Sequence, residues 1–360
     1  MSRYCRCGTA LAADNRTRLC GACQTTREGG APDVPAEFWQ TDVMAAALDS
    51  GDLGRVLRAY RCHPYHRQRV SPELVPHWTR LMGLLDDQDA SLGSHDVLPA
   101  VRRELGLIVE HRNVARGVLR TDLLRVEARW SQFASYLAHD ADDERMADYW
   151  ADRASRLAEE GDYPDMVARV LVRRSQWAVA GFDAQPAVAF AQAARNISGT
   201  SDQIRALCAM KEADAHALAD DADACERSLA DARAFVDRAD TPRASDVAGH
   251  ELAPHYLLAA EARCWLWLQP HRAIAMYDDA VRRWPHHRTR SRGVHQSRLA
   301  LACVGADEPE RAVTEGIKAL EIARTRRSKV IQRDLARLDQ RLAACDVPAA
   351  ADFHEALATL

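Results

Sequence analysis

Three similar stretches decide the fold of this sequence: PAVAFAQAARNI (186–197), HRAIAMYDDAVRRW (271–284) and ERAVTEGIKALEIA (310–323). Each has a small residue at its second or third position, Ala187, Ala273 or Ala312, and another alanine seven positions later. Residues seven positions apart lie on the same face of an α-helix, two turns from each other. Each stretch therefore predicts a helix with a small-residue face against which a neighbouring helix can pack closely.

The same small-residue spacing recurs five times along the chain. A small residue is followed by another 12 positions later, and by a third seven positions beyond that. In the fourth copy Glu261 occupies the first place, and the adjacent Ala262 serves if the loop is one residue shorter. The copies are Ser135/Ala147/Ala154, Ser175/Ala187/Ala194, Ala213/Cys225/Ala232, Glu261/Ala273/Ala280 and Ala300/Ala312/Ala319. This spacing is typical of a tetratricopeptide unit, in which two antiparallel helices pack where their side chains are small.

The successive copies are longer than the usual unit. Their middle positions lie 40, 38, 48 and 39 residues apart, whereas the consensus period is about 34 residues. We therefore expect longer helices or inserted loops. An alanine-rich sequence can match this template by chance, so an unrelated helical bundle is the alternative. Five copies in order favour an all-α fold with a tetratricopeptide-like helical repeat superhelix.

A repeat superhelix has a functional consequence. Stacked helical hairpins curve so that one concave face becomes an extended binding groove. The concave positions flank the first small residue of each unit. For any one of them, an ordinary helix-surface or core position is the alternative. The candidate groove residues are Arg129, Gln132, Tyr136, Gln176, His255 and Trp265.

The composition is that of a globular protein in the cytoplasm. The chain has 360 residues, of which 47% are hydrophobic, and a formal net charge of -4. No apolar run reaches the roughly 18 residues that suggest a membrane-spanning helix. The first residues lack the apolar region of a secretory signal. We therefore expect a cytoplasmic location and no membrane partner.

Four of the ten cysteines crowd near the N-terminus: Cys5, Cys7, Cys20 and Cys23. Two close pairs of thiolates supply the closed tetrahedral shell of a structural Zn²⁺ ion, and so short a segment needs the metal in order to fold. We expect structural zinc. Iron in a four-sulfur site and free or disulfide-linked thiols are the alternatives. The scattered remainder are expected to be small buried hydrophobic residues: Cys62, Cys208, Cys225, Cys264, Cys303 and Cys345.

The order of these features resembles a family of actinobacterial regulators. CRCGTALAADNRTRLCGAC is followed by PAEFW, VLRAYR and HPYH, and the tail contains LLRVEARWSQFASYLAHD, AEARCWLWLQPHRAIAMY and RLAACDVPAAADF. In that family an Xre-like helix-turn-helix precedes a tetratricopeptide-like sensor domain. The resemblance implies a zinc-binding knuckle at 1–24, a linker at 25–35, a degenerate helix-turn-helix-like helical segment at 36–96 and a repeat domain at 97–360.

The resemblance is weakest in the helix-turn-helix segment that should contact DNA. DLGRVLRAYR (52–61) fits a first helix and SPELVPHW (71–78) a second, but Pro76 is expected to kink the second. The acidic stretch 86–96 is expected to be a loop or a boundary and is a poor groove reader, because carboxylates repel phosphates. A basic run at 282–292 is expected to be an exposed linker. The candidate DNA contacts are Arg55, Arg58, Arg61, Arg67 and Arg69.

The five candidate arginines have a second interpretation. The chain has only three lysines, Lys211, Lys318 and Lys329, so arginine abundance by itself is poor support for phosphate binding. A solvated arginine-rich face explains residues 55–69 as well as a DNA contact does.

We expect a cytoplasmic transcriptional regulator whose repeat domain senses a peptide, a small ligand or a partner protein. The alternative is a protein–protein interaction adaptor that does not bind DNA and keeps a structural zinc module. No nucleophile elbow, phosphate loop, zinc-protease motif or dinucleotide fingerprint is present in the sequence. We therefore do not expect an enzyme. The open partners are DNA, an occupant of the repeat groove and a second copy of the chain.

Overall fold

The computed structural model describes residues 70–239, 249–326 and 328–360. The chain forms two compact units, one made of residues 1–74 and 110–116 and the other of residues 75–109 and 117–360. The helices that concern function belong to the second unit.

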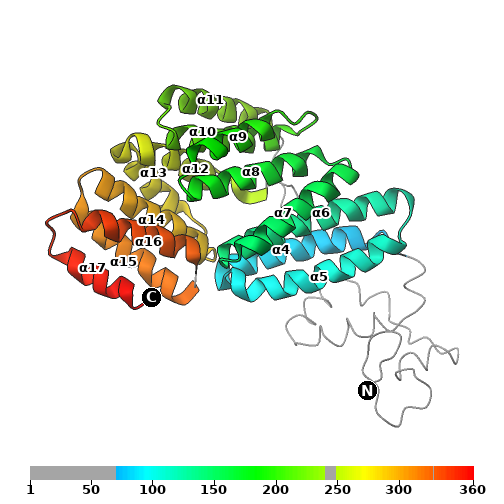
Figure 1. The fold of residues 1–360 in the computed structure, drawn as a ribbon, viewed down its shortest axis with the longest axis horizontal. Coiled ribbons are helices and arrows are strands. Elements are labelled where there is room, and N and C mark those ends of the chain that lie inside the picture. The colour runs from blue at the N-terminus through cyan, green and yellow to red at the C-terminus, as the bar shows by residue number, and fades with distance from the viewer. Residues whose placement is uncertain (1–69, 240–248, 327) are drawn as a thin grey trace, which may run out of the picture. The chain divides into compact units, whose positions relative to one another are not determined.

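The described residues form fourteen α-helices, one short 3₁₀ helix and no β-strand (Figure 1). No helix among them has the length and apolarity needed to cross a membrane. The bounds are α4 Leu74–Leu92, α5 Ser94–Val114, α6 Gly117–Asp140, α7 Glu144–Glu160, α8 Pro164–Ala180, α9 Ala184–Arg195, α10 Asp202–Leu218, α11 Ala222–Arg238, η2 Gly249–Leu252, α12 Pro254–Leu268, α13 Pro270–Arg283, α14 Thr289–Gly305, α15 Pro309–Arg326, α16 Lys329–Leu342 and α17 Ala349–Ala358.

Consecutive helices pack in pairs: α6 with α7, α8 with α9, α10 with α11, α12 with α13 and α14 with α15. Each of the five pairs carries one copy of the small-residue spacing. Every small residue in the five copies is at most 4% exposed, and Ala262, which is fully buried, takes the place of Glu261. In the second pair the Ser175 hydroxyl donates to the carbonyl oxygen of Ala187 at 2.9 Å, which joins the first two positions of the pattern directly. The prediction of an all-α fold is confirmed.

Five turns between consecutive helices share a backbone feature. Each places a non-glycine residue in the left-handed region, which aspartate tolerates better than most residues because its short side chain can hydrogen-bond locally. Four of these residues are aspartates, so the turns carry a second repeated signal that the small-residue pattern does not include. The residues, with their φ values, are Asp142 (69°), Asp162 (48°), Phe182 (61°), Asp220 (60°) and Asp307 (62°).

The segment from residue 74 to residue 96 corrects two expectations. Leu74–Leu92 is one continuous helix, so SPELVPHW and the residues after it are not two helices separated by a tight turn. Pro76 is the third residue of α4, and a first-turn residue has no intrahelical partner for its N–H group, so proline is tolerated there. The acidic stretch 86–96 is helical except at Gly93 and is not a loop; Gly93 marks a boundary between α4 and α5.

The buried cysteines agree with the sequence. Cys208, Cys225, Cys264 and Cys303 are buried, and Cys345 is partly exposed. Burial raises the pKa of the Cys208 thiol to about 12, which leaves it protonated and unreactive at neutral pH. The prediction that these residues act as small core side chains is confirmed for the four, whereas Cys62 lies outside the described residues.

Candidate functional site

A cavity of about 320 Å³ lies along the first helices of the pairs. Its walls come from α6, α8, α10, α12 and α14, with further side chains from α4, η2 and α16. In α12 the lining residues are Tyr256, Ala259, Ala260 and Arg263, a spacing of three and four that corresponds to one helix face. The volume is at the lower end of the range of about 300–1,000 Å³ typical of small-molecule sites.

Four of the six predicted groove residues line this cavity. Arg129, Gln132 and Tyr136 reach it from α6, and Gln176 reaches it from α8. The α6 residues follow the spacing i, i+3, i+7, which keeps them on one face. The structure thus brings together four side chains that the repeat spacing nominated, and their role in binding remains a prediction.

The two positions nominated in α12 need correction. Trp265 is 1% exposed and belongs to the core. It follows the lining residue Arg263 by two positions, and a helix turns about 100° per residue, so Trp265 points away from the cavity. His255 packs against Trp284 with ring centroids 4.7 Å apart and is not part of the lining. Tyr256 and Arg263 hold the lining positions instead.

The lining is cationic although the whole chain is acidic. It contains eight arginine or lysine side chains and five carboxylates. The cavity lining therefore has a positive net charge, whereas the chain as a whole has a formal net charge of -4. The cations are Arg129, Arg169, Arg173, Lys211, Arg263, Arg288, Arg290 and Arg298, and the carboxylates are Asp86, Asp89, Asp140, Asp214 and Glu251.

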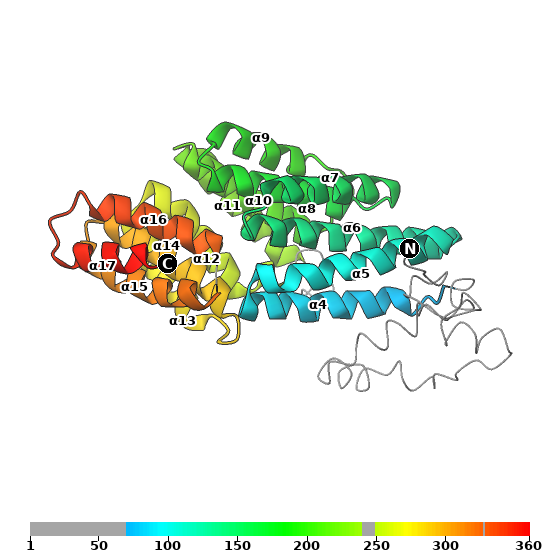
Figure 2. The same ribbon diagram turned by 60° about the horizontal axis from the view of Figure 1, so that its bottom comes forward.

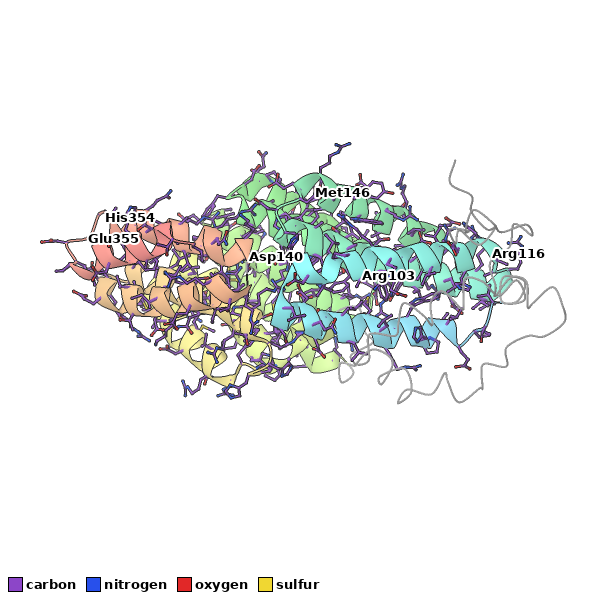
Figure 3. All side chains as sticks on the ribbon, turned by 90° about the horizontal axis from the view of Figure 1, so that it is seen from below. Arg103, Arg116, Asp140, Met146, His354 and Glu355 are labelled. Carbon is purple, nitrogen blue, oxygen red and sulfur yellow. The ribbon has the colours of Figure 1, made fainter. Side chains whose placement is uncertain are left out.

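A buried ionic cluster forms part of the cavity lining. Arg290, at the start of α14, pairs with Asp89 of α4 and lies 3.2 Å from Asp140 of α6. The Ser94 hydroxyl lies 2.6 Å from Asp89 and 2.9 Å from Asp140, and the Tyr136 hydroxyl donates to Asp89 at 3.2 Å. The three charged side chains are only 2–4% exposed. Figure 3 shows Asp140 at this junction of helices.

A second ion pair joins the same two segments, α4 and residues 288–290. Arg288 pairs with Asp86 and lies 3.4 Å from Asp87, and the Ser91 hydroxyl donates to the carbonyl oxygen of His287 at 3.1 Å. The acidic stretch of α4 therefore serves as the partner of the basic run at 282–292. The exposed linker expected there is corrected at Arg288 and Arg290, which are 5% and 3% exposed.

The start of α16 also contacts the early helix pairs. The Ser328 hydroxyl donates to Asp140 at 3.3 Å, and Arg333 pairs with Asp142 at 2.6 Å. Arg337 donates to the carbonyl oxygen of Ala180 at 2.6 Å and lies over the Phe182 ring. The ends of α4 and α6 approach α14 and α16 in Figure 2. The first and last parts of the helix series are thus joined around the cavity.

The two histidines of the lining are neutral at physiological pH. Burial, followed by Arg333 and Arg173, lowers the pKa of His139 to about 4, and the ring stacks on Trp177 at 5.0 Å. Burial, with the nearby Arg298, holds the pKa of His295 well below its ordinary value. The positive charge of the cavity therefore comes from arginine and lysine.

Several buried polar atoms of the lining have no protein hydrogen-bond partner among the described residues. They are Gln132 Nε2, Gln176 Oε1, the Nε atoms of Arg169 and Arg173, and His295 Nδ1. Buried polar atoms are normally paired, and an unpaired one costs about 1–3 kcal/mol. This concentration in one cavity favours a ligand with polar groups of its own.

The predicted metal and DNA contacts fall elsewhere. Cys5, Cys7, Cys20 and Cys23 lie outside the described residues, as do all five candidate arginines between positions 55 and 69. Within residues 70–239, 249–326 and 328–360, no group of three or more histidine, cysteine or acidic residues is arranged to hold a metal ion.

Functional assignment rests on the cavity and the sequence pattern. No model of a protein family matches this chain, and a search of the curated proteins finds no match either.

Proposed function

We propose that residues 97–360 form a tetratricopeptide-like repeat superhelix whose groove binds a peptide, a small ligand or a partner protein. The observation that carries the proposal is the cavity itself, bounded by the first helices of the pairs and lined by buried polar atoms without protein partners. Since leaving such atoms unpaired destabilises a fold, a binding role explains their retention better than a structural one does.

The same proposal makes the full chain a cytoplasmic transcriptional regulator. In it, Cys5, Cys7, Cys20 and Cys23 hold structural Zn²⁺, and the N-terminal part contacts DNA. Ligand binding acts by favouring one arrangement of the protein over another, and it shifts the equilibrium only through a difference in affinity for the two. This part of the proposal is supported by the resemblance of the sequence to actinobacterial Xre-like regulators.

The geometry of α4 limits where DNA contact is to be sought. Asp86, Asp87 and Asp89 are paired with arginines of the α14 region, and residues 74–92 form one helix with no turn. A recognition helix within this stretch is therefore disfavoured. Under the proposal, DNA contact belongs to Arg55, Arg58, Arg61, Arg67 and Arg69.

The test is fluorescence polarisation of the full chain with labelled DNA from its own upstream region, with and without a zinc chelator. We expect salt-dependent binding that weakens in Arg58→Ala/Arg61→Ala and with chelator. Arg282→Ala/Arg283→Ala is the matched control, because these two arginines are exposed on α13. Absence of salt-dependent binding by the full chain refutes the DNA-binding part.

The adaptor is the second candidate function, and the uninterrupted α4 helix favours it. It predicts a partner protein recovered with the full chain. Recovery should depend on cavity residues such as Tyr136 and be indifferent to changes at Arg55–Arg69. Native mass spectrometry of the full chain after incubation with a small-molecule extract separates this outcome from that of a small-ligand sensor.

A further inference from the structure

In the described structure, the cavity wall formed by α8, α10 and η2 carries more positive side chains than carboxylates. Arg169 and Arg173 lie one turn apart on α8, Lys211 lies on α10, and Glu251 comes from η2. Arg169 pairs with Glu251. Throughout the described part of the chain, neither Arg173 nor Lys211 forms a hydrogen bond or an ion pair.

The remaining carboxylates of the cavity are engaged elsewhere. Asp214, which lies one turn after Lys211, accepts a hydrogen bond from Arg263 at 2.9 Å. Asp89 and Asp140 pair with Arg290, and Asp86 pairs with Arg288. Among the described residues, therefore, no carboxylate forms a direct ion pair with Arg173 or Lys211.

Arg173 and Lys211 are partly buried in the cavity wall, and partial burial without a direct counter-ion disfavours their charged forms. Burial lowers the pKa of Arg173 to about 10, and the neighbouring Arg169 contributes to the shift. Burial also lowers the pKa of Lys211, a shift that Glu251 and Asp214 oppose and Arg263 and Arg169 reinforce. A charge that is withdrawn from water without a direct counter-ion destabilises the fold.

The surroundings provide groups for the rest of a ligand. The Arg173 guanidinium lies over the Tyr136 ring at 4.8 Å, which fixes its orientation. Gln176, one turn after Arg173, and Gln132 of α6 present an acceptor and a donor without protein partners. The Trp177 ring lines the same region. Guanidinium groups bind paired anionic oxygens and lysine acts as a point charge, so this wall suits a carboxylate or phosphate.

We propose that Arg169, Arg173 and Lys211 form an anion subsite that binds the carboxylate or phosphate group of a small-molecule ligand. The proposal deepens the proposed function and rests on it, because it names the chemistry of a ligand held in the cavity. The volume of about 320 Å³ accommodates a small molecule. Gln132 and Gln176 bind its uncharged polar groups.

The test is isothermal titration calorimetry of the full chain with three probes: succinate, inorganic phosphate and the uncharged succinamide. We expect one anionic probe or both to bind with a stoichiometry of one, and succinamide to bind at least tenfold more weakly. The preferred probe distinguishes a carboxylate ligand from a phosphate ligand. Lys211→Met and Arg173→Met should each weaken anion binding at least tenfold, whereas Lys211→Arg should retain most of it.

Arg282→Met is the matched control, since this exposed side chain is far along the chain from the subsite residues and pairs only within its own helix in the described structure. It should leave anion binding unchanged. Thermal unfolding without a probe adds an independent readout: Lys211→Met should unfold at a higher temperature than the wild type, because it removes a partly buried charge that has no direct counter-ion. A lower unfolding temperature would instead mark Lys211 as structural and overturn the proposal.

Binding of neither anion, or equal binding by wild type and Lys211→Met, also overturns it. If the anions fail while native mass spectrometry finds an uncharged molecule whose retention needs Gln132, only the anion subsite is refuted. If nothing is retained at all, the proposed ligand-binding function fails with it.

Discussion

The buried cluster around Arg290 makes the sharpest prediction about stability. Arg290 is 4% exposed and neutralises two carboxylates, Asp89 and Asp140, which are 2% and 3% exposed. Arg290→Met keeps an unbranched side chain of similar length but leaves both carboxylates without their cation. Removing one partner of a buried ion pair costs about 3–5 kcal/mol. We expect a loss of that size in the free energy of unfolding at neutral pH.

The matched control is Arg283→Met on α13. Arg283 pairs with Asp279 at 2.9 Å, but it is 65% exposed, and exposed pairs contribute about 0–1 kcal/mol. Asp89→Asn supplies the second arm of a double-mutant cycle. Because the double variant Asp89→Asn/Arg290→Met removes a carboxylate together with its cation, it should be about 2 kcal/mol more stable than additivity predicts.

The pH dependence of the stability loss in Arg290→Met provides a second test. Burial, followed in smaller part by Asp140 and Asp86, raises the pKa of Asp89 above its ordinary value of 3.8, although Arg290 and Ser94 oppose the shift. The folded state therefore binds this proton more tightly than the unfolded chain, so ionisation of Asp89 lowers stability as the pH rises above about 3.8. Without Arg290 this penalty grows. The deficit of Arg290→Met should thus be largest at neutral pH and smaller in acid.

Urea unfolding followed by circular dichroism and tryptophan fluorescence measures these differences, and coincidence of the two curves tests whether a single transition is present. Hydrogen exchange of residues 85–92 and 288–296 reports local opening of the same contact. The reasoning is refuted if Arg290→Met and Arg283→Met lose the same stability within about 1 kcal/mol, or if the double-mutant cycle is additive.

Four further predictions concern packing, titration and metal binding. Ala187→Leu should destabilise the fold by about 1–3 kcal/mol because Ala187 is fully buried where α9 packs on α8. Its control, Ala189→Leu, lies at an exposed site of the same helix, and urea unfolding should show almost no effect of it on stability. Gly316→Ala should also destabilise the fold, since a Cβ atom there would lie 2.6 Å from Leu338 and 2.9 Å from Phe353. Its control, Gly106→Ala, meets no atom within 4 Å and should stabilise α5 by about 0.5–1 kcal/mol. Equal effects of the two substitutions on stability would contradict the packing around Gly316. The pKa of His139 falls from 6.5 to about 4 on folding, so its contribution to stability is complete above pH 6.5 and is lost as the pH falls toward 4. His139→Gln should therefore lose less stability over that interval than the wild type, and a parallel loss in both would count against it. Metal analysis of the purified full chain should find one zinc ion that disappears in Cys20→Ser/Cys23→Ser and persists in Cys345→Ser; a metal-free wild type would refute the knuckle.

The sequence predicted the helices and their pairing from local information. Small residues spaced by 12 and seven positions mark where two helices approach, and those at Ala147, Ala187 and Ala312 are at most 1% exposed. Such a pattern is readable because helix periodicity fixes which residues share a face. The same reasoning nominated Gln132, Tyr136 and Gln176, which line the cavity.

Register within a single helix was harder to predict. In α12 the expected groove positions His255 and Trp265 differ from the lining residues Tyr256 and Arg263 by one and two positions. A shift of one residue rotates a side chain by about 100°, so an error too small to affect the helix prediction moves a residue from cavity to core. The pattern itself indicated this problem, because Glu261 occupies a position where the repeat requires a small residue. In the structure the adjacent Ala262 occupies that position.

Only the tertiary structure decided what the charges do. Asp89 and Arg290 are separated by 201 positions, and in an arginine-rich chain no local pattern specifies which carboxylate meets which guanidinium. Their pairing turns an acidic stretch and a basic run into one buried contact, whereas no carboxylate of the described residues forms an ion pair with Arg173 or Lys211. The difference arises because pairing depends on long-range chain geometry, and the small-residue pattern records only how adjacent helices touch.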